Sequence, residues 1–267
     1  MNPLDFTNHH RLTPGKNTLF DMSVSVVSAA ASHPFGVIKS LQQSQGAVRR
    51  ELSFRHLGSG LPLRLVSTPI FLGLGGCNYF FFYLFSEGGT RPLNVKELIM
   101  SALFSATLSA PFYQLTDVAI YQQNLARVRG EQCSLFFTAK KVWKIGGVYN
   151  TFPITAFLCA AGSINTLALG PLLFYHVSTR EKSQAAGFAA LSGYAMAYAL
   201  LTQPLDTVRT RMQQNLTSKF SHVVLEIVRH EGIKVFWRGG LIRGLNHTAS
   251  ALSYVFFQYV VAKEFIS

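Results

Sequence analysis

The sequence predicts an all-α membrane protein in which six transmembrane helices form three pseudo-repeats around a central cavity, with short surface helices on one side. Of the 267 residues, 49% are hydrophobic and only 13% are charged, which favours a membrane protein over a water-soluble domain. Long apolar segments fill the chain from end to end. A proline also recurs at an equivalent place in three successive parts of the chain, which indicates an internal repeat.

The six apolar segments each exceed the length of about 20 residues that a helix needs to cross a bilayer. They are 18–43, 60–86, 95–123, 151–178, 184–214 and 240–265. The connections after the second and fourth segments are short, whereas those after the first, third and fifth are long and amphipathic. In the last of these, Phe220, Val223 and Ile227 recur at helical spacing, which predicts a surface helix.

Each predicted repeat therefore consists of a span, a surface helix and a second span. The expected divisions are an N-terminal tail, 1–17, followed by repeats over 18–90, 91–182 and 183–267. The tail contains acids, histidines and prolines but no apolar run, so we expect any targeting information to be internal.

Pro34, Pro111 and Pro204 lie inside the first span of each predicted repeat. A proline within a helix removes a backbone hydrogen bond and kinks the axis. Three such kinks would bend three helices toward one another and close one end of the cavity. Two runs of small residues at four-residue spacing should let helices approach closely in lipid. These runs are Ala102, Ala106, Ala110 and Ala189, Gly193, Ala197.

Charged residues follow Pro204 directly, because Asp206 and Arg209 lie within the next two turns. Ionisable groups at membrane depth need a partner or water. Two interpretations stay open at this point. The two side chains pair with each other on one helix, or each reaches across the cavity to a neighbouring repeat.

Other classes of function find little support in the composition. The net charge is +12, but without a basic arm or lysine-rich run we expect no nucleic-acid partner. Cys77, Cys133 and Cys159 are far apart and lack CxxC spacing, which argues against a disulfide framework or a metal site. No catalytic constellation or Walker-type loop can be assembled, so we expect neither an enzyme nor a cofactor.

The stretch "PLDTVRTRMQ" at 204–213, followed by "EGIKVFWRG" at 231–239, resembles the signature of the mitochondrial carrier family. The resemblance implies a transporter of a small solute in a mitochondrial membrane, most naturally the inner one. The first two repeats depart from the signature. After Pro34, Gly36 occupies the acid position, although Lys39 keeps the first basic position; after Pro111 the acid position holds Tyr113.

The family's pairing rule joins the acid of each odd-numbered span to the base of the next one around the ring. It implies a gate pair between Asp206 and Lys39. Arg209 would face the position of Tyr113, with Asp117 as a candidate substitute acid. We therefore expect a gate weaker than one with three intact pairs. The family's opposite gate lacks its acids here, so that end closes by aromatic packing or does not close.

Carriers bind solute near the bilayer midplane. The resemblance places the contacts at Val66 on the second span, Ala161 and Gly162 on the fourth, and Asn246 and His247 on the sixth. Arg64 and Arg243, one turn earlier, are the strongest candidate cations of the cavity, either binding solute or extending to the membrane interface. The excess of bases over acids favours an anion of the nucleotide or carboxylate class.

Basic residues concentrate in the long connections, which places these on the matrix side and both termini toward the cytosolic side. The expected partners are a small-molecule solute and membrane lipid, with anionic lipid near Gly232 and Gly239, and the expected state is a monomer. The departures of the first two predicted repeats from the signature support a second interpretation. In that reading the chain is a carrier-fold scaffold, receptor or insertion factor that does not transport.

Overall fold

Helices dominate the computed structural model, which describes residues 14–43, 61, 65, 77–88, 91–128, 140, 144 and 147–256. These residues contain no strand, so the all-helical class predicted from the sequence is confirmed for them. The longer elements are α1 (Pro14–Gln43), α4 (Cys77–Phe85), α5 (Val95–Val128), α7 (Gly147–Ser163), α8 (Gly170–Arg180), α9 (Gln184–Gln214) and α11 (Gly240–Phe256). The shorter ones are α10 (Phe220–Glu226), the π-helical η3 (Ile164–Leu169) and η4 (Ile227–Glu231), and the 3-10 helix η5 (Ile233–Trp237).

Three helical stretches among these residues are long and apolar enough to cross a membrane. They are Val95–Gln123, Asn150–Arg180 and Gln184–Gln214, and they coincide with the predicted third, fourth and fifth spans. The other three predicted spans stay predictions. Of these, 18–43 falls within α1, while 60–86 and 240–265 are described only in part.

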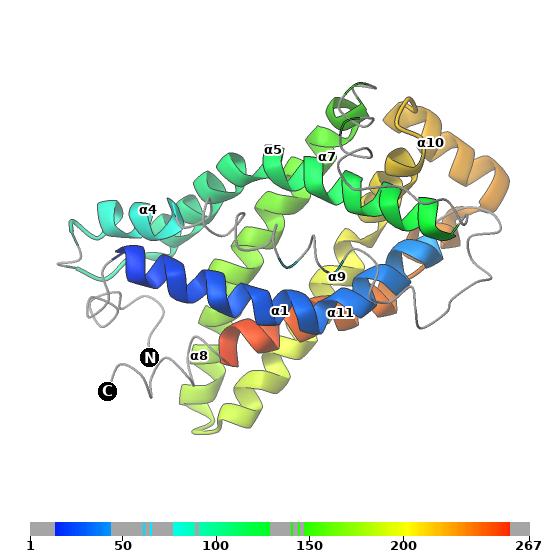
Figure 1. Cartoon of the computed structure of the whole chain (residues 1–267). Helices are drawn as coiled ribbons and strands as arrows, with labels where there is room; N and C mark the ends of the chain where they lie inside the picture. The colour runs from blue at the N-terminus through cyan, green and yellow to red at the C-terminus, as the bar shows by residue number, and fades with distance from the viewer. Residues whose placement is uncertain are drawn as a thin grey trace.

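The helices contact one another in a cycle (Figure 1). α1 runs beside α11, α11 packs on α9, and α9 packs on α7 and α8. α7 packs in turn on α5, α5 on α4, and α4 returns to α1. Helices from the two ends of the chain therefore lie side by side, which brings α1 within reach of α9.

The packing of α1, α8, α9 and α11 is the largest apolar cluster of the described residues. Its buried members are Val24, Phe174, Leu191, Ala195, Ala251, Tyr254 and Val255. α9 and α11 approach most closely at Gly244, where an added Cβ would lie 1.9 Å from the Sδ atom of Met196. A side chain at 244 would therefore have to displace Met196.

One of the two predicted runs of small residues packs as expected and the other does not. Ala102, Ala106 and Ala110 of α5 are buried. On α9, however, Ala189, Gly193 and Ala197 are exposed, and a Cβ at Gly193 would meet nothing within 4 Å. The buried face instead carries Leu191, Ala195 and Ala199. The prediction for α9 was wrong because α8 and α11 cover a face offset by two residues.

Pro34, Pro111 and Pro204 lie inside α1, α5 and α9 as predicted, and the bend at each stays a prediction. The predicted surface helix over 220–228 is present as α10 and the start of η4. Its buried residues Val223 and Ile227 pack on Val208 and Met212 of α9. This contact holds the segment after α9 against the end of that helix.

Candidate functional site

Asp206 is the centre of a buried group of charges. Its side chain is only 2% exposed, and Lys39 Nζ of α1 lies 2.9 Å from its Oδ2 atom. Arg209 Nη2, one turn along α9, lies 2.9 Å from Oδ1, and Arg243 Nε of α11 lies 3.5 Å from Oδ2. The intrahelical and interhelical contacts that the sequence left as alternatives therefore occur together in this structure.

Gln43, at the end of α1, also holds Asp206. Its Nε2 atom donates to Asp206 Oδ2 over 3.0 Å, while its Oε1 accepts from Thr210 Oγ1 over 2.9 Å. Sequence reasoning missed this residue because an amide carries no charge. A signal was available, since Gln43 and Gln213 each follow the proline of their helix by nine residues.

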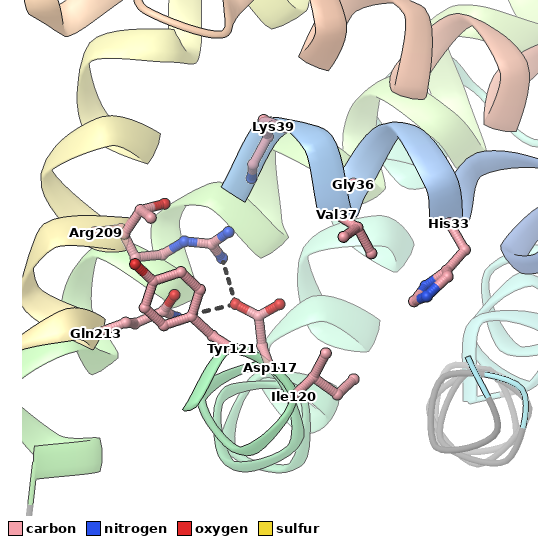
Figure 2. A pocket seen from close by; sticks show the side chains of 10 residues that line it. His33, Gly36, Val37, Lys39, Asp117, Ile120, Tyr121, Arg209 and Gln213 are labelled. Carbon is pink, nitrogen blue, oxygen red and sulfur yellow. Dashed lines mark hydrogen bonds and ion pairs between the residues drawn. The ribbon is translucent and has the colours of Figure 1, made fainter. Parts of the chain in front are cut away.

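Asp117 of α5 lies on the other side of Arg209, whose Nη1 atom is 3.5 Å from Asp117 Oδ2 (Figure 2). Gln213 Nε2 donates to the same oxygen over 2.9 Å. Asp117 follows Tyr113 by one helical turn, so the two positions share a face of α5. The structure thus brings the candidate substitute acid to Arg209.

The resulting ion cluster consists of Lys39, Asp117, Asp206, Arg209 and Arg243. Opposite unit charges 4 Å apart attract by about 4 kcal/mol at an effective dielectric constant near 20, before the desolvation of both groups is subtracted. The cluster contains more cations than acids. Arg209 is 7% exposed, and its Nε atom has no hydrogen-bond partner among the described residues.

A small cavity of about 30 Å³ adjoins the ion cluster where α1, α5 and α9 meet (Figure 2). Its lining residues are His33, Gly36, Val37, Lys39, Asp117, Ile120, Tyr121, Arg209, Thr210 and Gln213. Gly36 occupies the position at which the signature has an acid, so this wall carries no side chain from the first repeat's acid position.

Two of the predicted solute contacts on α11 bind other parts of the protein. Arg243 is buried, and besides its contact with Asp206 its Nη1 atom donates to the Ala199 carbonyl oxygen over 2.6 Å. Asn246 Nδ2 donates to the Ser32 carbonyl oxygen of α1 over 2.6 Å. Their role in binding solute stays a prediction, and Arg64 and Val66 lie outside the described residues.

Tyr198 of α9 connects the other predicted contacts. Its ring meets the His247 ring edge-on, with centroids 5.3 Å apart, and its Oη atom would lie 3.6 Å from a Cβ added at Gly162. Ala161, next to Gly162 on α7, is half-buried. Sequence reasoning did not select Tyr198, because nothing in the signature marks this position.

Polar contacts join the two halves of the third-repeat signature. Arg211 Nη2 donates to Glu231 Oε2 over 2.9 Å, and Gln203 Nε2 donates to the Arg238 carbonyl oxygen over 2.7 Å. Gly232 and Gly239 have φ angles of 84° and 78°, in the left-handed region that favours glycine. The signature therefore encodes the packing of α9 on the segment that follows it.

Comparison with known proteins agrees with the signature. Residues 180–267 match the family model described as mitochondrial carrier protein. The chain is also similar to the tricarboxylate transport protein of Saccharomyces cerevisiae, with 37% identity over 76 residues, which cover 26% of this chain and 25% of that relative. The alignment thus spans about a quarter of the relative's length. The family resemblance predicted from residues 204–239 is confirmed over residues 180–267.

Proposed function

We propose that this chain, a member of the mitochondrial carrier family by its third repeat, transports a small anionic metabolite by alternating access. One observation carries the proposal, namely the buried contact between Lys39 of α1 and Asp206 of α9, with 2.9 Å between Nζ and Oδ2. It joins the predicted first repeat to the third. A contact that closes one end of a carrier has to break when that end opens.

The proposed architecture has six spans in three repeats, over 18–90, 91–182 and 183–267, around a central cavity. The cycle of helix contacts that returns from α11 to α1 supports a closed ring. The basic long connections support a matrix location for them, with both termini toward the cytosolic side of the inner membrane. In this proposal the chain is a monomer, with anionic lipid near Gly232 and Gly239.

In the proposed cycle, opening of the gate separates α1 from α9 and removes Lys39 from Asp206. Arg209 stays close to the carboxylate because it belongs to α9 itself. Arg243 lies on α11, which packs on both α1 and α9. Solute binding offsets the loss of the contact between Lys39 and Asp206. The attraction in this pair is about 4 kcal/mol before the desolvation of both groups is subtracted. The excess of cations in the ion cluster supports an anionic solute.

The test is uptake by liposomes that contain the full chain, with labelled tricarboxylates, dicarboxylates, nucleotides and amino acids. We expect saturable uptake of at least one anion. Lys39→Gln and Asp206→Asn should each lower the rate by about tenfold or more, because about 1.4 kcal/mol corresponds to a factor of ten. Lys96→Gln, at an exposed lysine of α5, is the matched control and should leave uptake unchanged.

Two results would contradict the proposal. Uptake that neither gate substitution alters would remove the role assigned to the Lys39–Asp206 contact. Absence of uptake for the whole panel, with folded protein in the liposomes, would favour a carrier-fold scaffold, receptor or insertion factor.

A further inference from the structure

The ion cluster holds an uncompensated positive charge. Lys39, Arg209 and Arg243 surround Asp206, and Asp117 is the second acid among the described residues of the cluster. The charges of α1, α5 and α9 balance in this group, so the surplus arises because Arg243 of α11 joins it. Buried charges require a counter-charge or hydrogen bonds to be stable.

The cavity beside the ion cluster has the size and the lining for a small anion. Its volume of about 30 Å³ leaves room for at least one water-sized ligand. Two cations of the cluster, Lys39 and Arg209, line it. Thr210 lines it too, but its hydroxyl already donates within the protein. Asp117 also lines it, but its Oδ2 atom is already engaged by Arg209 and Gln213.

Arg209 gives a second, independent indication of a ligand. Its side chain is 8% exposed, and two of its nitrogens contact Asp117 and Asp206. The third, Nε, has no hydrogen-bond partner within the part of the chain that the structure describes. A buried guanidinium nitrogen left unpaired is costly, and an anion close to the guanidinium would offset its charge.

We propose that the cavity at the junction of α1, α5 and α9 binds one small anion, either a chloride ion or a carboxylate group. The anion contacts Lys39 and Arg209 and neutralises the ion cluster while α1, α5 and α9 are together. None of the predicted solute contacts Ala161, Gly162, Asn246 and His247 lines this site, whereas Arg243 belongs to the ion cluster beside it. The proposal does not depend on transport, and measurements of anion binding alone test it.

The experiment measures the unfolding temperature of the full chain in detergent by tryptophan fluorescence, at constant ionic strength. Sodium chloride, sodium acetate and sodium gluconate are compared, because gluconate is too large for the cavity. We expect chloride or acetate to raise the unfolding temperature by about 3 °C over gluconate, with a saturating concentration dependence. An effect of chloride alone identifies a halide site, and an effect of acetate identifies a carboxylate site.

Substitutions at Gly36 separate this site from a general salt effect. Gly36→Asp supplies a carboxylate at the cavity wall, so it should raise the unfolding temperature in gluconate and abolish the difference between the salts. Gly36→Asn has nearly the same volume without the charge and should not raise it. Lys39→Gln removes one positive charge and should also abolish the difference.

The proposal is overturned if the unmodified chain unfolds at the same temperature in all three salts. It is equally overturned if the difference between salts persists unchanged in both Gly36→Asp and Lys39→Gln. Should Gly36→Asp not fold, the unmodified chain and Lys39→Gln still decide the question.

Discussion

The two sides of the ion cluster differ in how they are built. On the α1–α9 side, Lys39 contacts Asp206 over 2.9 Å, and the carboxylate is 2% exposed. On the α5–α9 side, Arg209 contacts Asp117 over 3.5 Å, and that carboxylate is 19% exposed. A glutamine supports each side, Gln43 at Asp206 and Gln213 at Asp117.

The difference teaches that a lost signature residue need not mean a lost contact. Lys39 and Asp206 stand at signature positions, and their contact is short and buried. The acid position of α5 holds Tyr113, yet Asp117 reaches the same arginine from one turn further along the helix. The contact between Arg209 and Asp117 is longer and more exposed to solvent, so we expect it to contribute less to the stability of the fold.

The largest expected effect comes from removal of each acid in turn. Asp206→Asn leaves three buried cations short of a counter-charge and should destabilise the chain by about 3 kcal/mol or more, whereas Asp117→Asn should cost about 1 kcal/mol. The measurement is the unfolding temperature of both variants in the same detergent. Glu181→Gln, at an exposed acid, is the control and should stay within about 0.5 kcal/mol. Equal losses for Asp206→Asn and Asp117→Asn would contradict the comparison.

Double-mutant cycles should show the same order with a smaller magnitude. We expect a coupling of about 2 kcal/mol for Lys39→Gln with Asp206→Asn, and about 0.5 kcal/mol for Arg209→Gln with Asp117→Asn. Unfolding in a denaturant series gives both values. A larger coupling on the α5 side would show that Asp117 is the dominant partner of α9.

A rescue experiment sharpens the comparison further. Tyr113→Asp in an Asp117→Asn background returns an acid to the signature position on the same face of α5. We expect recovery of most of the roughly 1 kcal/mol lost in Asp117→Asn, while Tyr113→Asn in the same background should recover none. Recovery by both, seen in unfolding temperatures, would mean that removal of the tyrosine ring matters and the charge does not.

The last prediction concerns Gly239, where the signature ends. Its φ angle is 78°, and an added Cβ would lie 3.4 Å from Gln42 Oε1 and 3.6 Å from Gln43 Cγ. Those distances are ordinary contacts, so Gly239→Ala should cost about 1–2 kcal/mol through backbone strain alone. Gly193→Ala is the matched control, because Gly193 is exposed inside α9 and alanine there should stabilise by up to about 1 kcal/mol. If Gly239→Ala and Gly193→Ala changed the unfolding temperature equally, the positive φ angle of Gly239 would not be important for stability.

Sequence reasoning predicted what depends on pattern and charge. For three spans, the predicted bounds lie within two residues of the bounds in the structure, because the length of an apolar segment is a local property of the sequence. The surface helix over 220–228 followed from its periodicity. Asp206 was identified as a residue that needs partners, since an ionised group at that depth cannot stay unpaired.

The rest depends on how each helix is rotated about its axis, which a single sequence does not reveal. α9 offers two faces of small residues, and only the positions of α8 and α11 decide that Ala195 is buried and Gly193 is not. The rotation of α11 likewise turns Arg243 toward Asp206. Gln43 was missed because an uncharged amide in a polar stretch is not selected by charge; its position nine residues after Pro34, matched by Gln213 after Pro204, was the signal that could have found it.

Asp206 shares its helix with Arg209, so the contact between these two side chains does not depend on where α1 lies. In the proposed opening, a separation of α9 from α1 would leave this carboxylate with a cation beside it. The ammonium group of Lys39 would then be the charge that loses its partner.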